Sequence, residues 1–421
     1  MPPPPPPTTR PVTAGYDADV GGRAYHRSMT KSLRMIDLFA GCGGMTVGFA
    51  AEGFRSVLAV EWDRAAAATY AANFGEEHVI AGDIAGVPNE AIPEADIIIG
   101  GPPCQGFSNL GLKDINDPRN QLWREFMRFV KHSRPKVFVI ENVDRFAKSP
   151  EFAMLLAEAD HGALAEYELQ HAVLNAADYG VAQRRKRTIV IGSRIGRIDL
   201  PNATHTKDPA EGSGLKPWRT VRDVIGAIPP HPLTTELPDT RSAFFGETMP
   251  GVFRGLDLHI RRTPTSKSLD RYSFIPPGGG RFDLPHALLP NCWANKPTGT
   301  TDVMGRLRWD MPSVTIRTEF FKPEKGQYLH PQWEAGEWVE EYGKHRSDPV
   351  RSVDRVISHF EASLIQDFPA DYRWVGTKIQ IARQIGNAVP SGLAQAIAQQ
   401  IKPHLVAARI ADEQELELAV A

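Results

Sequence analysis

The chain has 421 residues, 42% hydrophobic and 23% charged, which excludes a collagen, a wholly disordered chain and a disulfide-stapled miniprotein. Three cysteines cannot form a disulfide framework, so a reduced, cytoplasmic setting is expected. No apolar run approaches the roughly 20 residues of a membrane helix, and the first 31 residues lack the apolar centre of a signal peptide. The net charge of −2 means that binding to nucleic acid would need a local excess of basic residues.

Residues 1–31, which include six consecutive prolines, are predicted to be a disordered tail. From residue 32 to 200, short apolar runs alternate with helix-length segments. The expected strands are Leu33–Ala40, Ser56–Glu61, Asp96–Gly100, Lys136–Glu141 and Arg187–Ser193. The expected helices are Gly44–Glu52, Ala65–Phe74, Gln121–His132 and Glu151–Glu158. This alternation predicts an α/β fold with a doubly wound, mostly parallel sheet, which binds ligands at the carboxyl ends of its strands.

A different composition begins near residue 201. In 201–330 there are 28 glycines and prolines, and 17 basic residues stand against 13 acidic ones. We predict a smaller, loop-rich domain inserted over 201–350 that faces a polyanion, with an irregular surface insertion as the alternative. Residues 351–377 are expected to be a hinge, and 378–421 a return to the first domain with a final helix over Ile385–Ile401.

Side chains suited to a nucleoside gather at the ends of the first three expected strands. The first strand runs into the glycine-rich loop Asp37–Gly44 (DLFAGCGG), where the backbone can approach a ligand closely. Glu61 follows about 20 residues later, at a spacing typical of a carboxylate that binds ribose hydroxyls. Asp83 ends a further short strand, the third in chain order, and the loop contains no Lys or Arg, which favours a nucleoside over a phosphate. Each residue taken singly could instead be a cap or a surface residue.

A cysteine follows the fourth expected strand, in the rigid Pro-Pro turn of Gly100–Ser108 (GGPPCQGFS). Cys104 is therefore placed beside the expected ligand, as a nucleophile would be, although a lone cysteine is more often structural. Cys42 and Cys292 are interpreted as structural.

Five motifs, in this order, resemble those of the DNA (cytosine-5) methyltransferases, which take a methyl group from S-adenosylmethionine. They are Asp37–Gly44, Pro103–Gln105, Glu141–Val143, Gln183–Arg187 and Gln384–Pro390. The resemblance implies a catalytic domain over 32–200, completed by 378–421, and a target-recognition domain over 201–350. It also implies S-adenosylmethionine as cofactor and double-stranded DNA as partner, in an enzyme of the bacterial restriction-modification type.

The resemblance also assigns catalytic roles. Cys104 would add to carbon 6 of a cytosine rotated out of the duplex, so that carbon 5 can attack the methyl group. Glu141 would contact the exocyclic amine and ring nitrogen 3, while Arg185 and Arg187 would hold the base and supply positive charge. The segment Gly106–Asn120 is expected to be a lid that closes on DNA.

Further residues carry over as ligand contacts. Phe39 and Trp62 would enclose the adenine, Asp83 would accept from its amino group, and Asn387 would hold the amino-acid end. The full predicted cofactor set is Phe39, Gly41, Gly43, Glu61, Trp62, Asp83, Ile84, Pro103, Leu122, Asn387 and Ala388. The predicted DNA contacts are Gln105, Ser108, Arg119 and Gln183, and no metal ligand is expected. Arg355 and Glu361 resemble a late Arg…Glu element that organises the recognition domain.

DNA affinity would come from basic residues of the recognition domain, with phosphate contacts supplying most of it. The candidates are Arg261, Arg262, Lys267, Arg271, Arg281, Arg306, Arg308 and Arg317. The enzyme is expected to be a monomer that works beside a restriction endonuclease of the same specificity. Alternatives are a tRNA-cytosine methyltransferase, a non-catalytic DNA-binding relative and a small-molecule methyltransferase, of which the last explains only the glycine loop and Glu61.

Overall fold

The computed structural model describes residues 32–103, 122–162, 164–294, 298–299, 302–331, 338–341, 344–347 and 353–420. The chain divides into Met1–Ser32 and Leu33–Ala421, and the description below concerns the second unit. The predicted tail and lid lie outside the described residues, as do Cys104, Gln105, Ser108 and Arg119. Within the described part, no helix is both long enough and apolar enough to cross a membrane.

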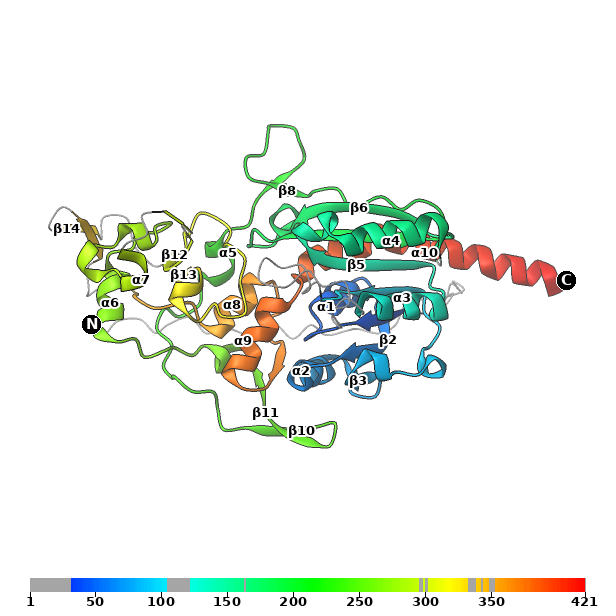
Figure 1. Cartoon of the computed structure of the whole chain (residues 1–421), viewed down its shortest axis with the longest axis horizontal. Helices are drawn as coiled ribbons and strands as arrows, with labels where there is room; N and C mark the ends of the chain where they lie inside the picture. The colour runs from blue at the N-terminus through cyan, green and yellow to red at the C-terminus, as the bar shows by residue number, and fades with distance from the viewer. Residues whose placement is uncertain are drawn as a thin grey trace, which may run out of the picture. The chain divides into compact units, whose positions relative to one another are not determined.

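A seven-stranded, mostly parallel sheet forms the centre of the molecule, as predicted (Figure 1). Its strands are β1 (Leu33–Leu38), β2 (Phe54–Glu61), β3 (Val79–Ala81), β4 (Ile97–Gly100), β5 (Val137–Val143), β6 (Glu168–Asn175) and β7 (Lys186–Ser193). They are ordered β3-β2-β1-β4-β5-β7-β6, and β7 alone runs opposite to the others, because it pairs antiparallel with both β5 and β6. Strand β6 was not predicted, because this edge strand buries few side chains and has no continuous apolar run.

Helices cover both faces of the sheet. These are α1 (Gly44–Ala51), α2 (Arg64–Phe74), α3 (Leu122–Ser133), α4 (Pro150–His161) and α10 (Ser391–Val420). Alternate strand residues point to opposite faces, so Ile97 and Ile99 join a core with α1 and α10, whereas Ile98 joins one with α3 and α4. Burial on both faces explains the near-continuous apolar strands, and it leaves the loops at the strand ends available for chemistry.

The predicted single helix over Ile385–Ile401 is wrong, because two helices share this stretch. Helix α9 (Lys378–Asn387) ends at Ala388, whose backbone is extended, and α10 begins at Ser391. Pro390 accounts for the break, since the residue before a proline is pushed out of helical geometry. Helix α10 then packs closely on α1, where a Cβ on Gly48 would lie only 2.4 Å from the Ser391 carbonyl oxygen.

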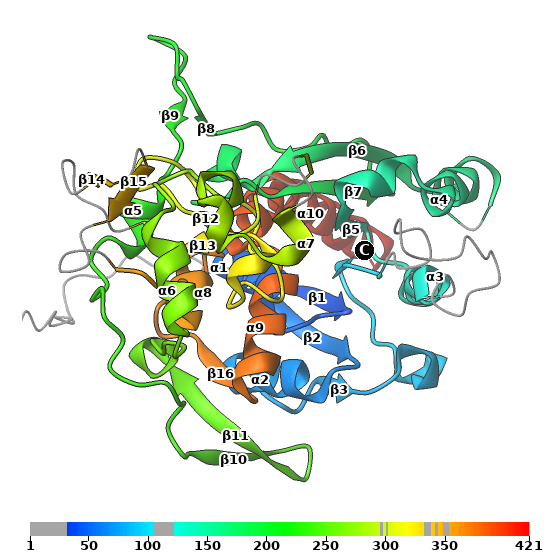
Figure 2. The ribbon, with the colours of Figure 1, turned by 60° about the vertical axis from the view of Figure 1, so that its left-hand side comes forward.

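The described part of residues 201–350, called the inserted stretch below, forms short elements with little regular sheet. Its strands are β8 (His205–Thr206), β9 (Lys216–Pro217), β10 (Arg241–Phe244), β11 (Glu247–Arg254), β12 (Gly305–Arg306), β13 (Gln327–Leu329), β14 (Trp338–Glu341) and β15 (Lys344–Ser347). Its helices are α5 (Val221–Ile225), α6 (Ser266–Ser273) and α7 (Asn291–Ala294). After it come α8 (His359–Ile365) and β16 (Arg373–Val375), which pairs with β11. Helices α8 and α9 lie between this stretch and the large sheet (Figure 1), and the β10–β11 hairpin projects outward (Figure 2).

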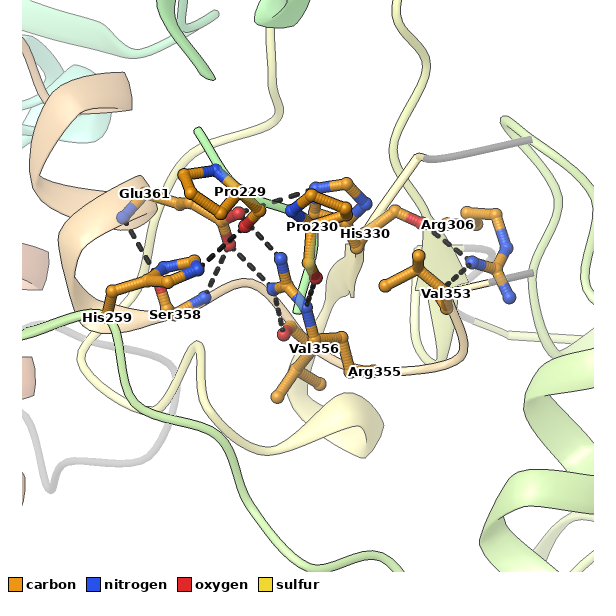
Figure 3. Close-up of polar contacts among 10 residues, drawn as sticks. All are labelled: Pro229, Pro230, His259, Arg306, His330, Val353, Arg355, Val356, Ser358 and Glu361. Carbon is orange, nitrogen blue, oxygen red and sulfur yellow. Dashed lines mark hydrogen bonds and ion pairs between the residues drawn. The ribbon is translucent and has the colours of Figure 1, made fainter. Parts of the chain in front are cut away.

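A buried ion pair joins the inserted stretch to α8 (Figure 3). Both Arg355 Nη atoms lie 2.7 Å from Glu361 oxygens, and Arg355 Nε donates to the Pro230 carbonyl. Burial alone would raise the pKa of Glu361, but Arg355 and His330 beside it hold that pKa well below its ordinary value. The predicted Arg…Glu element therefore exists as a charge pair, closed off from water.

Arg306 lies in the interior, which is incompatible with the phosphate contact suggested by its sequence. Its guanidinium donates to the carbonyl oxygens of Ile275, His330, Val353 and Tyr272 and to the carboxylate of Asp354. Arg281 is buried as well. A guanidinium offers five N–H donors in a fixed plane, so one Arg306 side chain holds together segments of the inserted stretch that share little regular structure.

We predict that Arg306→Met lowers the free energy of unfolding by about 3 kcal/mol or more, because it leaves buried acceptors and Asp354 without their partner. Urea unfolding followed by tryptophan fluorescence measures this. Arg308→Met is the matched control, since its ion pair with Asp310 is exposed and should contribute less than about 1 kcal/mol. Equal losses in both variants would contradict the structural role of Arg306.

Candidate active site

A cavity of about 820 Å³ opens at the carboxyl ends of β1 to β5, where the strand order reverses between β1 and β4. One wall consists of strand ends and the loops that follow them. A second wall consists of residues 315–318 of the inserted stretch and of residues between Arg383 and Val389. The volume of the cavity lies in the range of ligand sites, and residues far apart in the sequence meet in the cavity.

The glycine loop after β1 forms the floor of the cavity. Phe39 has a φ of +56°, a conformation that is unfavourable for an aromatic residue and that tends to persist only where function requires it. Gly43 has a φ of +92° and precedes α1, and a Cβ on it would lie 2.6 Å from the Phe74 ring. Phe39 and Gly41 line the cavity, whereas Gly43 contacts Phe74 and supports the turn from behind.

Glu61, at the end of β2, holds this loop in place. One carboxylate oxygen accepts from the Gly41 N–H at 2.8 Å and the other from the Asp63 N–H at 2.7 Å. Burial raises the pKa of Glu61, while the two backbone donors act in the opposite direction. Each carboxylate oxygen has a second lone pair, so Glu61 can also accept from hydroxyl groups of a ligand.

The other predicted cofactor residues also meet at this cavity. Lining it are Trp62, Asp83, Ile84, Pro103, Leu122, Asn387 and Ala388. The Trp62 side chain is 71% exposed, which is unusual for tryptophan and leaves its ring free to pack on a planar ligand. Asp83 caps the short helical turn at Ile84 by accepting from the Ala85 N–H.

Predicted catalytic groups occupy another part of the same cavity. Glu141 Oε1 lies 2.8 Å from Arg187 Nε, and both side chains are largely buried. Asn142 donates to the Pro102 carbonyl at 2.8 Å, which fixes the turn that leads to position 104. The arrangement places a carboxylate, a guanidinium and the chain leading to Cys104 around one space.

Arg185 also lines the cavity, but its guanidinium is bound to backbone. It donates to the carbonyl oxygens of Ile316 at 3.0 Å and of Gly386 at 2.9 Å. Burial lowers the pKa of Arg185 to about 9, and the neighbouring Arg187 adds to this effect. Arg185 thus joins the two walls of the cavity, a role that its sequence motif did not indicate.

Gln183 is fully buried, which argues against the predicted direct contact with DNA. Its carbonyl oxygen accepts from the Ile316 N–H at 3.0 Å, and its amide nitrogen lies 2.5 Å from Gln366 Oε1. Both polar atoms of the side chain are therefore bound within the protein.

Sequence reasoning missed several polar lining residues, among them Asp37, Arg383 and Thr318. Asp37 is buried, accepts from the Thr46 hydroxyl at 2.6 Å and has its pKa raised to about 7 by burial. Its place in the glycine-loop motif, at the end of a buried strand, was a usable signal. Arg383 and Thr318 carried no such signal, because only the folded chain brings them to this wall.

We predict that Asp37 makes a contribution to the free energy of unfolding that falls as pH rises from about 4 to 7. The folded state keeps the Asp37 proton up to about pH 7, whereas the unfolded chain releases it near the ordinary value of 3.8. Asp37→Asn removes this contribution, so the loss of stability between pH 5 and 8 should be smaller in the variant. Urea unfolding at both pH values tests this, and an unchanged difference would contradict it.

Comparisons with known proteins agree with this geometry. The C-5 cytosine-specific DNA methylase family matches residues 33–249 and 290–403. The Type II methyltransferase M1.HphI of Haemophilus parahaemolyticus is 32% identical over 88% of this chain and 87% of its own length. The Type II methyltransferase M.NgoPII of Neisseria gonorrhoeae is 31% identical over 89% of this chain and 96% of its own length.

Solved structures share the fold. A prophage-encoded methyltransferase of E. coli superimposes with a TM-score of 0.62 at 24% identity, over 89% of this chain and 99% of its own. The Entamoeba histolytica methyltransferase EhMeth gives a TM-score of 0.55 at 16% identity, with the same coverage of both chains. The sequence matches extend over both walls of the cavity, and the chain therefore belongs to the C-5 cytosine-specific DNA methylase family and is a DNA (cytosine-5) methyltransferase.

Proposed function

We propose that this enzyme transfers a methyl group from S-adenosylmethionine to carbon 5 of a flipped cytosine in a specific duplex sequence, through a Cys104 adduct. The observation that carries the proposal is the single cavity in which the acidic strand ends meet the Glu141–Arg187 pair. Restriction-modification is the proposed setting, with a restriction endonuclease of the same specificity as partner, because the matched relatives are Type II methyltransferases. A monomer in the cytoplasm, acting on nucleoid DNA, completes the proposal.

The first part of the cavity suits a positively charged nucleoside cofactor. Asp37, Glu61 and Asp83 line it, Glu61 has acceptor capacity for ribose hydroxyls, and the exposed Trp62 ring can pack on adenine. Asn387, which also lines the cavity, would bind the amino-acid end. S-adenosylmethionine would supply an electrophilic methyl group there, beside Glu61 and Asp83, whose carboxylates favour its net positive charge.

The second part of the cavity suits a cytosine ring. A Cys104 thiolate would form a bond to carbon 6, which places an electron pair on carbon 5. That pair would attack the methyl carbon while the methyl–sulfur bond breaks, and S-adenosylhomocysteine would leave with the electrons of that bond. Transfer of the carbon 5 proton to water and release of the thiolate from carbon 6 would restore the ring. Glu141 would bind the exocyclic amine and ring nitrogen 3, and Arg187 holds the Glu141 carboxylate in place at 2.8 Å. The flipped base must reach this space because carbon 6 is not accessible inside a duplex.

We predict that Trp62→Ala weakens S-adenosylmethionine binding by roughly tenfold, the order expected for loss of an aromatic stacking contact. The side chain is exposed, so the free energy of unfolding should change little. Isothermal titration calorimetry with the full chain measures the affinity. Leu233→Ala is the control, because Leu233 is 92% exposed and does not line the cavity. Equal affinities in the wild type and Trp62→Ala would remove Trp62 from the cofactor site.

Bisulfite sequencing of DNA from cells that express the chain tests the proposed reaction. We expect protected cytosines in one short sequence context, and their absence in an isogenic strain that expresses Cys104→Ser. A serine hydroxyl is too weakly acidic to replace the thiolate, so turnover should fall by several orders of magnitude while binding remains.

Two outcomes would overturn parts of the proposal. Comparable methylation by folded Cys104→Ser would show that Cys104 is not the nucleophile. No protected cytosine with folded wild-type protein would exclude DNA as substrate under these conditions and would favour tRNA, the substrate of the alternative considered from the sequence.

A further inference from the structure

The two backbone polar groups of Ile316 are held by two neighbouring side chains of one motif. The Ile316 N–H donates to Gln183 Oε1, and the Ile316 carbonyl accepts from Arg185, each at 3.0 Å. Backbone bonds continue this contact, since Ser313 exchanges hydrogen bonds of 2.8 Å with Ala182 and Arg184. Residues 313–316 are thus bound in register to residues 182–185, which lead into β7.

A series of hydrogen-bonded amide groups continues from this contact to Ala388. The amide nitrogen of Gln183 donates to Gln366 Oε1 at 2.5 Å, and the amide nitrogen of Gln366 donates to the Ala388 carbonyl. Both glutamines are fully buried. Each accepts at its oxygen and donates at its nitrogen, so the series runs in one direction from Ile316 to Ala388.

Arg185 forms a second connection between the same two segments. It binds the Ile316 carbonyl and, at 2.9 Å, the Gly386 carbonyl. The two connections therefore start at one residue of the inserted stretch and end on either side of Asn387. Residues 315–318 and 386–388 both line the cavity.

We propose that Gln183 and Gln366 are positioning residues that couple the cofactor segment 386–388 to segment 313–318, which faces the target DNA. The inference rests on the proposed function, because it assigns one ligand to each segment. A buried amide that loses its partner is strongly unfavourable, so neither segment can shift alone without breaking this series of hydrogen bonds. Ligands that favour the same bridged arrangement therefore strengthen each other's binding, and to the same extent in both directions.

The test measures the affinity of the full chain for S-adenosylhomocysteine, with and without a short duplex that carries the context found by bisulfite sequencing. We expect the duplex to tighten binding in the wild type by at least about fivefold, the lower end of typical coupling. Gln183→Met and Gln366→Met keep side-chain volume but remove the hydrogen bonds, and each should bring this ratio close to one. The double variant should lose no more of the coupling than either single variant, because both glutamines belong to the same series of hydrogen bonds.

Gln399→Met is the matched control, since Gln399 is an exposed glutamine on α10 that binds Glu52 and does not line the cavity. If the methionine variants do not fold, Gln183→Glu and Gln366→Glu replace them. Each glutamate keeps one acceptor oxygen but has a second oxygen in place of the donor nitrogen of glutamine, which interrupts the series of hydrogen bonds at that residue.

The outcomes separate this inference from the proposed function. Two results would overturn this inference and leave the proposed function intact. One is a wild type that methylates DNA but binds S-adenosylhomocysteine equally well with and without the duplex. The other is a set of variants in which the duplex tightens binding as much as in the wild type. A purely structural role would lower the thermal midpoint and both affinities without changing their ratio, and this too would overturn it. A folded wild type that neither methylates DNA nor binds the cofactor analogue would instead refute the proposed function.

Discussion

Burial of the central sheet on both faces is the constraint on which the rest of the molecule depends. Alternate residues of β4, β5 and β7 join two separate cores, one with α1 and α10 and one with α3 and α4. Polar chemistry cannot enter these layers, because a buried polar group without a partner is costly. It is confined to the edge at which the parallel strands end, and the reversal of strand order between β1 and β4 opens that edge into a cavity.

Within the cavity, charge is divided between two regions. Asp37, Glu61 and Asp83 lie at or just after the ends of β1, β2 and β3 and line one region with carboxyl groups. Asp37 keeps its proton up to about pH 7, so Glu61 and Asp83 are the groups that favour a positively charged cofactor. Glu141 and Arg187 form an ion pair in the other, where a polar ring with both donors and acceptors can be bound. The two regions are adjacent because β2, β1, β4 and β5 are neighbours in the sheet, although their ends are far apart in the sequence.

Arginines of the inserted stretch show how much depends on tertiary structure. Arg306 and Arg308 are two residues apart, and composition gives both the same interpretation as contacts to a polyanion. Arg306 instead binds four carbonyl groups and Asp354 in the interior, whereas Arg308 pairs with Asp310 in an exposed position. A loop-rich region has few backbone hydrogen bonds between strands, so a buried guanidinium can supply the missing donors.

The sequence by itself determined the doubly wound fold, five strands of the sheet, and the family, because buried parallel strands and strand-end motifs have patterns that local sequence records. The structure brings nearly all of the predicted cofactor residues to one cavity, with Gly43 behind the loop. Only the tertiary structure decided which polar residues face that cavity and which support it. Gln183 and Arg185 lie in a motif that suggests contacts with DNA, yet their partners are Ile316, Gln366 and Gly386. Those partners lie more than a hundred residues away, and no local pattern encodes a hydrogen bond across that distance.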